Sequence, residues 1–365
     1  MKDVVLISTW PPAACGIATY SQALVNAHRA SGLRVTVLAE IADIRHPTQS
    51  EPGVFSCWAR DWVYETKYGL GAIPKAIRSS EKKPDIVHIQ HEFGIFPDPN
   101  GFLKLISELL GMGIKVAITF HTVPNPPQYK LFFRALPHDA VVFVHNLEAA
   151  SILSSANHDK VYTIPHGVEF NDEPKQDSDD HYFLCPGFIS RSKGIEMILD
   201  AYYEASIRKM LPQLRIMGLC RDENYLEQLQ RKANGLFVGK SVMIKSAFLA
   251  QDTMKRIIRN CTAVILGHTP GRSESGEKKK LYSSSGQLAL ALGTGKAIIA
   301  SDAPIYRRGG GILYYDTPGE CARHMMALVS NPTLKMGLEE RSLLEATRAS
   351  WHDVAEEQIK IMNSA

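Results

Sequence analysis

The sequence predicts an α/β protein made of two doubly wound parallel sheets that follow one another along the chain. Short, β-branched apolar segments alternate with amphipathic helical segments in two separate series, a pattern typical of buried parallel strands. The acidic, proline-containing stretch EFNDEPKQDSDDH (169–181) interrupts the alternation and has the composition of an interdomain linker. We therefore expect domains over 1–168 and 182–349, followed by a helix within 350–365.

Composition narrows the class of protein. The chain has 365 residues, of which 45% are apolar and 22% charged, with a net charge of +3; this length suffices for two cores and gives no strong sign of nucleic-acid binding. Its six cysteines are scattered without a CxxC pair, which favours reduced thiols over disulfides or a zinc site. With no signal peptide and no long apolar run, a cytoplasmic location is expected, with peripheral membrane contact left open.

The first series begins with a strand at 4–8, the loop TWPPAACGIATY, a helix over 19–30 and a strand at 33–39. Residues 40–80 are irregular and rich in aromatics, ending in a helix near 70–80. Further strands are expected at 85–90, 115–120, 140–145 and 161–164.

Polar side chains gather where these strands end. His91 and Glu92 follow one strand, and His121 follows the next; because ligands of such sheets collect at the carboxyl ends of strands, these residues predict an active-site rim. Gly16 lies in the first such loop. No metal is predicted, because the spacing in HIQHE differs from the helical HExxH motif.

The second series repeats the alternation. Strands are expected at 182–186, 214–218, 242–245, 262–266, 297–300 and 312–315, and helices over 195–208, 222–234, 251–259, 319–330 and 333–348. The loop GFISRSKG (187–194) places Arg191 and Lys193 at one helix entrance, and Ser284, Ser285 and Gly286 open another helix. Cations and unpaired helix N–H groups together predict a phosphate or diphosphate site.

Taken together, these motifs resemble the family 4 glycosyltransferases, which have the GT-B architecture of two Rossmann-like domains facing each other across a cleft. The motifs that carry the resemblance are PPAACGIATY (11–20), FHTVP (120–124), IPHGV (164–168), GFISRSKG (187–194), GTGKAIIASD (293–302) and SWHDVA (350–355). The last is similar to the helix that packs back on the first domain in this fold.

The resemblance implies transfer of a sugar from a nucleotide-diphosphate donor, with UDP or GDP, to a hydroxyl acceptor. The acceptor would be a glycan, a lipid-linked glycan or a small molecule, as in polysaccharide biosynthesis. The transfer would retain the anomeric configuration and need neither a metal nor a cofactor. By this resemblance Arg191, Lys193 and the amides of 284–286 would hold the diphosphate, and Gly16 would approach the sugar phosphate. His121 would contact the transferred sugar or the acceptor. The acceptor would lie in the first domain, against Tyr20, His91 and Glu92.

The chain departs from the family pattern at its Glu-x7-Glu signature, whose two positions are Tyr282 and Leu290, and at a loop arginine, whose position is Phe188. We expect Glu274 or Glu277 to replace the first glutamate. Two alternatives stay open: an inactive homologue that binds nucleotide-sugar or glycan, and an inverting or 2-epimerase GT-B enzyme.

A membrane-bound acceptor would call for a basic, apolar face on the first domain. Trp58, Arg60, Trp62 and Lys67 give a hint of such a face, although buried core aromatics explain them equally well.

Overall fold

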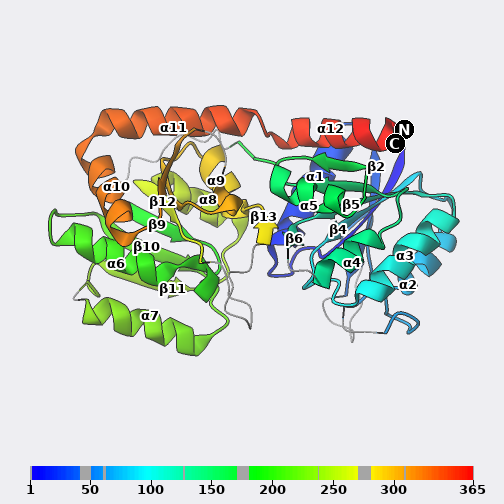
Figure 1. Cartoon of the computed structure of the whole chain (residues 1–365), viewed down its shortest axis with the longest axis horizontal. Helices are drawn as coiled ribbons and strands as arrows, with labels where there is room; N and C mark the ends of the chain where they lie inside the picture. Colours follow the sequence, from blue (N-terminus) through cyan, green and yellow to red (C-terminus); the bar gives the residue numbers. More distant parts are fainter. Residues whose placement is uncertain are drawn as a thin grey trace. The chain divides into compact units, whose positions relative to one another are not determined.

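The structure is a computed structural model that describes residues 2–41, 51–60, 63–125, 128–170, 181–236, 238–269, 281–307 and 310–364. The chain divides into two compact units, which are described separately (Figure 1). Unit 1 comprises residues 1–167, 279–284 and 351–365, and unit 2 comprises 168–278 and 285–350. Among the described residues, no helix is long and apolar enough to cross a membrane.

Unit 1 is built on a seven-stranded parallel sheet with strand order β3-β2-β1-β4-β5-β7-β8. The order reverses between β1 and β4, which is the arrangement of a doubly wound sheet. Its elements are β1 (Asp3–Ser8), α1 (Gly16–Ala30), β2 (Arg34–Glu40), β3 (Val54–Trp58), α2 (Ala72–Arg78), β4 (Ile86–His91), α3 (Pro99–Gly111), β5 (Lys115–Phe120), β6 (Thr122–Pro124), α4 (Gln128–Arg134), β7 (Val141–Val144), α5 (Leu147–Ser155), β8 (Val161–Thr163), β13 (Leu281–Ser283) and α12 (Trp351–Ser364).

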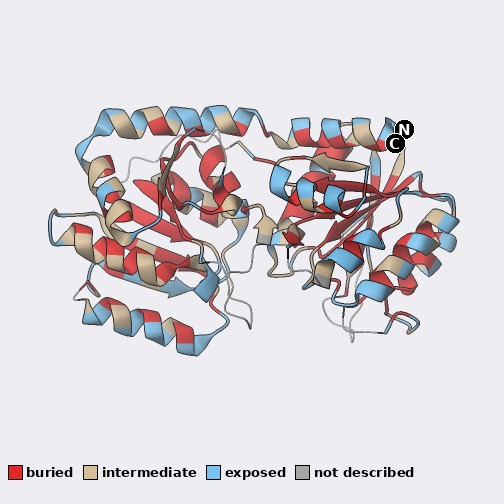
Figure 2. Cartoon of the chain, in the orientation of Figure 1, coloured by how far each residue is buried: buried red, intermediate tan, exposed pale blue. Residues whose placement is uncertain are grey.

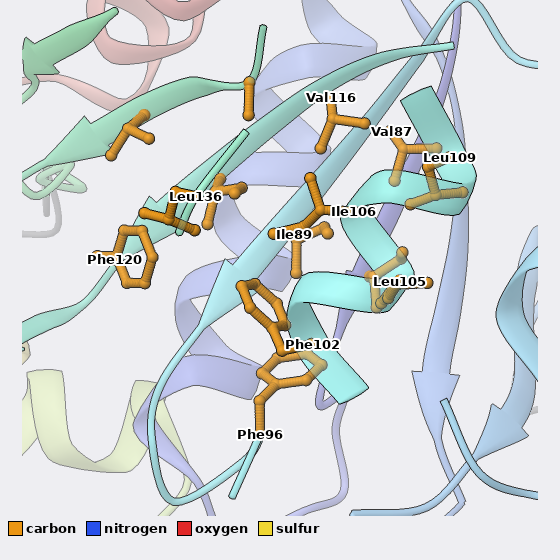
Figure 3. Packing of buried hydrophobic residues seen from close by; sticks show 14 of the residues in the cluster. Val87, Ile89, Phe96, Phe102, Leu105, Ile106, Leu109, Val116, Phe120 and Leu136 are labelled. Carbon is orange, nitrogen blue, oxygen red and sulfur yellow. The ribbon is translucent and has the colours of Figure 1, made fainter. Parts of the chain in front are cut away.

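Helices cover both faces of this sheet because each presents one apolar stripe. In α3 the buried side chains recur at helical spacing, and they pack against β4 and β5 (Figure 3): Phe102, Leu105, Ile106 and Leu109. Asp98 begins α3 by accepting a hydrogen bond from the Asn100 amide at 3.1 Å. The terminal helix α12 packs against α1 and adds Val354 and Met362 to the core on the other face.

Of the two interpretations of Trp58, the structure supports that of a core aromatic. Trp58 is fully buried, its ring stacks on Phe96 with centroids 5.1 Å apart, and its indole N–H donates to the Leu38 carbonyl at 3.1 Å. The Arg60 guanidinium forms a bidentate ion pair with the Glu40 carboxylate. Trp58 is therefore a core aromatic, while Trp62 lies outside the described residues.

Unit 2 is built on a six-stranded parallel sheet with order β11-β10-β9-β12-β14-β15, reversing between β9 and β12. In Figure 2 the central strands of this sheet are buried, whereas the edge strand β11 (Val242–Ser246) is largely exposed. Its elements are β9 (Tyr182–Pro186), η1 (Arg191–Lys193), α6 (Ile195–Ser206), β10 (Gln213–Gly218), α7 (Glu223–Gly235), β11 (Val242–Ser246), α8 (Gln251–Asn260), β12 (Ala263–Leu266), α9 (Gly286–Gly293), β14 (Ile298–Ser301), η2 (Pro304–Tyr306), β15 (Ile312–Tyr315), α10 (Pro318–Ser330) and α11 (Pro332–Thr347).

Two doubly wound parallel sheets confirm the predicted fold class. The segment 279–284, expected in the second domain, instead groups with unit 1. The physical reason is that β13 forms an antiparallel pair with β6, and that Asn146 Nδ2 donates to the Ser283 carbonyl at 3.2 Å. Of the expected linker, residues 171–180 lie outside the described residues.

Candidate functional site

The loop after β9 is the centre of the candidate site in unit 2. Gly187 has φ +103°, a conformation that disfavours side chains, and a Cβ there would lie 2.9 Å from Gln287 in the first turn of α9. A Cβ on Gly267, after β12, would lie 2.3 Å from the Lys193 carbonyl oxygen. The Thr269 amide donates to the Ser192 carbonyl at 2.8 Å. The 187–194 loop therefore packs tightly between the end of β12 and the start of α9.

Lys193 belongs to this loop, which packs between the end of β12 and the start of α9. Its side chain is half-buried, and within the described ranges its ammonium makes no hydrogen bond or ion pair. Burial lowers the pKa of Lys193, and burial together with the Lys193 charge lowers the pKa of His268 to about 4. A cation kept out of water without a protein anion is costly, so this position is suited to receive an anionic ligand.

Arg191, predicted to share this role, is already engaged. Its guanidinium lies 4.6 Å from the centroid of the Tyr225 ring and 3.7 Å from the Asp222 carboxylate. Tyr225 in turn donates to Glu196 at 2.9 Å. The structure thus places Arg191 against the first turn of α7, with part of its charge offset.

Sequence reasoning missed Arg221. It follows β10, the neighbour of β9, and its guanidinium lies 5.8 Å from the centroid of the Phe188 ring. Phe188 is the residue that stands at the position of the family's loop arginine. The only indication of Arg221 in the sequence is its position just after β10, the strand beside β9, and it lies outside the 187–194 loop.

The start of α9 provides backbone donors. Ser285 is its N-cap, and the Ser285 hydroxyl accepts a hydrogen bond from the Leu288 amide at 3.2 Å. The amides of the first turn have no intrahelical acceptors and carry the positive end of the helix dipole. Ser285 and Gly286 belong to unit 2, whereas Ser284 groups with unit 1.

In unit 1, a histidine follows or ends each of four strands that lie side by side: His91, His121, His145 and His166. His121 is 5% exposed, and both of its ring nitrogens have partners within unit 1. Nε2 lies 3.0 Å from Gln90 Oε1, and Nδ1 lies 3.3 Å from His145 Nε2. Burial, reinforced by the neighbouring histidines, holds the pKa of His121 well below its ordinary value.

The Tyr20 ring brings these histidines together. It meets His121, His145 and His166 edge-on, with centroids 4.5, 5.7 and 5.0 Å apart. Tyr20 and His121 are therefore in contact, as a shared site requires. His145 was not predicted as a site residue, because a histidine after a short apolar strand carries no motif of its own.

The other predicted acceptor residues are less available. His91 is 1% exposed and packed among phenylalanine rings of β5, α3 and α4, and burial lowers its pKa to about 3. The Glu92 carboxylate accepts from the Phe93 amide at 3.1 Å, and burial raises its pKa. Gly16, the residue expected to approach the sugar phosphate of the donor, is exposed at the first turn of α1, which begins there and not at residue 19 as expected.

Two further expectations concern chemistry. Glu274 and Glu277 lie outside the described residues, so the structure says nothing of their role. In the described part of the chain, no group of three or more His, Cys, Asp or Glu residues is arranged to hold a metal ion.

Comparisons with known proteins bear on the whole chain. Residues 14–172 match the family model described as Glycosyltransferase Family 4, while no curated protein sequence matches. Among solved structures, Anabaena Alr3699/HepE in complex with UDP is 12% identical with a TM-score of 0.72 over 100% of both chains. Sucrose-phosphate synthase (tll1590) from Thermosynechococcus elongatus is 14% identical with a TM-score of 0.76, covering 100% of this chain and 99% of that one. A glycosyltransferase from Rickettsia africae ESF-5 is 12% identical with a TM-score of 0.74, covering 100% and 98%.

At these identities the solved structures show the fold, which is that of GT-B glycosyltransferases, and the family model supplies the match in sequence. The resemblance predicted from the motifs is thereby confirmed. Residues 14–172 thus match the Glycosyltransferase Family 4 model, and the whole chain has the fold of GT-B glycosyltransferases.

Proposed function

We propose that this chain transfers a hexosyl group from UDP-sugar to a hydroxyl acceptor, with unit 2 binding the donor. In the reaction the bond between the sugar C1 and the diphosphate oxygen breaks, and a bond between C1 and the acceptor oxygen forms. The acceptor proton leaves with the released UDP. Retention of the anomeric configuration and independence of metal rest on the resemblance to family 4 alone.

The observation that carries the proposal is Lys193. Its side chain is partly buried and belongs to a loop that packs against the start of α9. A cation and a helix N-terminus therefore lie at the same edge of the sheet. Both stabilise the negative charge that develops on the leaving diphosphate. The choice of UDP is supported by Alr3699/HepE, whose structures were solved in complex with UDP and with UDP-glucose.

We assign a second cation to Arg221 in place of the missing loop arginine. A guanidinium has a planar set of N–H donors that matches phosphate oxygens, and it can rest over an aromatic ring. The Phe188 ring thus acts as the platform that holds Arg221. On this view Arg221, which follows β10, supplies the positive charge that the 187–194 loop lacks at Phe188.

The test is a turnover assay on the full chain with a panel of UDP- and GDP-sugars and mixed acceptors, with and without EDTA. UDP release is measured by chromatography, and the anomeric proton of the product by NMR. Lys193→Met is expected to lose the activity, whereas Lys240→Met is expected to keep it. Lys240 is the control because it is exposed and precedes β11, at the opposite edge of the sheet.

One alternative is favoured by a specific observation. The two signature glutamates are replaced by Tyr282, which lies in β13, and by Leu290, which packs on the core of unit 2. Neither offers a carboxylate to the donor. UDP binding without turnover of any donor would favour an inactive binding homologue, and absence of both would refute the proposed function.

A further inference from the structure

A line of hydrogen-bonded side chains crosses the buried centre of unit 1. His88 Nε2 lies 2.8 Å from Thr119 Oγ1 and 3.1 Å from Gln90 Nε2. Gln90 Oε1 lies 3.0 Å from His121 Nε2, and His121 Nδ1 lies 3.3 Å from His145 Nε2. The line ends where His145 Nδ1 lies 3.0 Å from the Ile164 carbonyl oxygen. Thr119, His88 and Gln90 are fully buried.

The Ile164 carbonyl at one end of this line determines which atom donates in each hydrogen bond. Because the Ile164 oxygen can only accept, His145 Nδ1 must carry its hydrogen. In a neutral His145, Nε2 is then an acceptor, so His121 must donate from Nδ1. A neutral His121 is left with Nε2 as an acceptor, which requires an N–H donor from Gln90.

The orientation of the Gln90 amide therefore determines how many protons the His121 and His145 rings carry together. With its nitrogen toward His121, every bond from His121 to Ile164 is satisfied by neutral rings. With its oxygen toward His121, as the structure has it, His121 Nε2 must donate, and one ring of the His121–His145 pair must carry a second proton. The amide oxygen and nitrogen are nearly alike in shape, so the two orientations fill the same space.

The surroundings make the extra proton sensitive to this amide. After burial, the described groups with the largest effect on the charge of His121 are His145, His166, His88 and His91, and none of these side chains carries a negative charge. Two further rings lie nearby: Tyr20, which meets His121 edge-on, and His28 of α1, whose ring centroid lies 6.1 Å from that of His88. The amide of Gln90 contacts His121 Nε2 directly, so its dipole can favour or oppose protonation of the pair.

We propose that Gln90 is a positioning residue that fixes the tautomer of His121 and controls proton uptake by the His121–His145 pair. The inference concerns unit 1 alone and does not depend on the proposed transfer reaction. If the chain catalyses the proposed transfer, Gln90 would set the pH range in which the His121–His145 pair has the protonation state that contacts the acceptor.

The experiment uses the full chain with ¹⁵N-labelled histidine, followed by ¹H–¹⁵N NMR from pH 5 to 9. The wild type is compared with Gln90→Glu and Gln90→Met, and His121→Asn assigns the His121 signals. A carboxylate at 90 accepts but does not donate, so the titration midpoint of the pair should rise by about one unit or more. In Gln90→Met the preference for the wild-type His121 tautomer should be lost.

The resonances of His158, which is hydrogen-bonded to the Ala140 carbonyl at 3.0 Å, report whether each variant is folded. Gln213→Glu is the matched control, because it introduces the same charge into unit 2. An unchanged His121 tautomer in Gln90→Met, together with an unchanged midpoint in Gln90→Glu, would overturn the proposal. Should Gln90→Glu fail to fold, the Gln90→Met tautomer decides alone.

Discussion

Adding a single methyl group at Gly267 should disturb the donor site without touching any charged group. A Cβ at this position would lie 2.3 Å from the Lys193 carbonyl oxygen and 3.2 Å from both Ile198 Cδ1 and Tyr315 Oη. The first separation must grow by roughly 1 Å to reach ordinary contact, which moves the backbone of the Lys193 loop. Overpacking of this kind costs about 1–3 kcal/mol. We expect Gly267→Ala to lower the Tm by about 2–4 °C per kcal/mol and to weaken UDP binding at least tenfold.

The control is Gly337→Ala in the middle of α11, where a Cβ meets nothing within 4 Å. Alanine favours a helix interior over glycine by up to about 1 kcal/mol, so this variant should keep or raise the Tm and bind UDP as the wild type does. Thermal unfolding and calorimetric titration with UDP measure both. If Gly267→Ala had the wild-type Tm and UDP affinity, the packing of Lys193 against β12 would not position the donor site.

Three further predictions follow from named contacts. Ser285→Ala removes the cap on the Leu288 amide and should cost about 1 kcal/mol of stability, measured by urea unfolding, whereas Ser285→Asp should keep most of it. Arg221→Met should raise the Kd for UDP several-fold in calorimetric titration, and adding Phe188→Arg to that variant should restore affinity; no change in either would remove Arg221 from the site. Burial lowers the pKa of His28 to about 4, so the folded state binds fewer protons than the unfolded one. Stability is then lost as the pH falls below about 6.5, by roughly 2 kcal/mol at pH 5 from this residue; His28→Leu should flatten that fall in urea titrations at pH 7 and 5.

The central strands were predictable because they are buried on both faces and read as short apolar runs. β9, for example, occupies Tyr182–Pro186 as expected, and the polar loops after it and its neighbours meet at one edge. Parallel topology alone dictates that convergence. The loop that carries Lys193 could therefore be placed from the sequence.

Other features depend on partners distant in the chain, which local patterns do not encode. β13 has three residues and exists because it pairs with β6, whose residues are about 160 positions earlier. The burial of His91 comes from rings on α3 and α4. Likewise, the contacts of Arg221 with Phe188 and of His145 with His121 join ends of different strands.

The most direct test of a donor site at Lys193 is a calorimetric titration of UDP into the wild type, Lys193→Met and Lys240→Met. Loss of a hydrogen bond to a charged group costs about 1.5–3 kcal/mol, so we expect a Kd about 10- to 150-fold weaker in Lys193→Met. Lys240→Met should bind as the wild type does. Equal affinity in all three proteins, or no UDP binding by the wild type, would contradict the claim that Lys193 marks a nucleotide-diphosphate site.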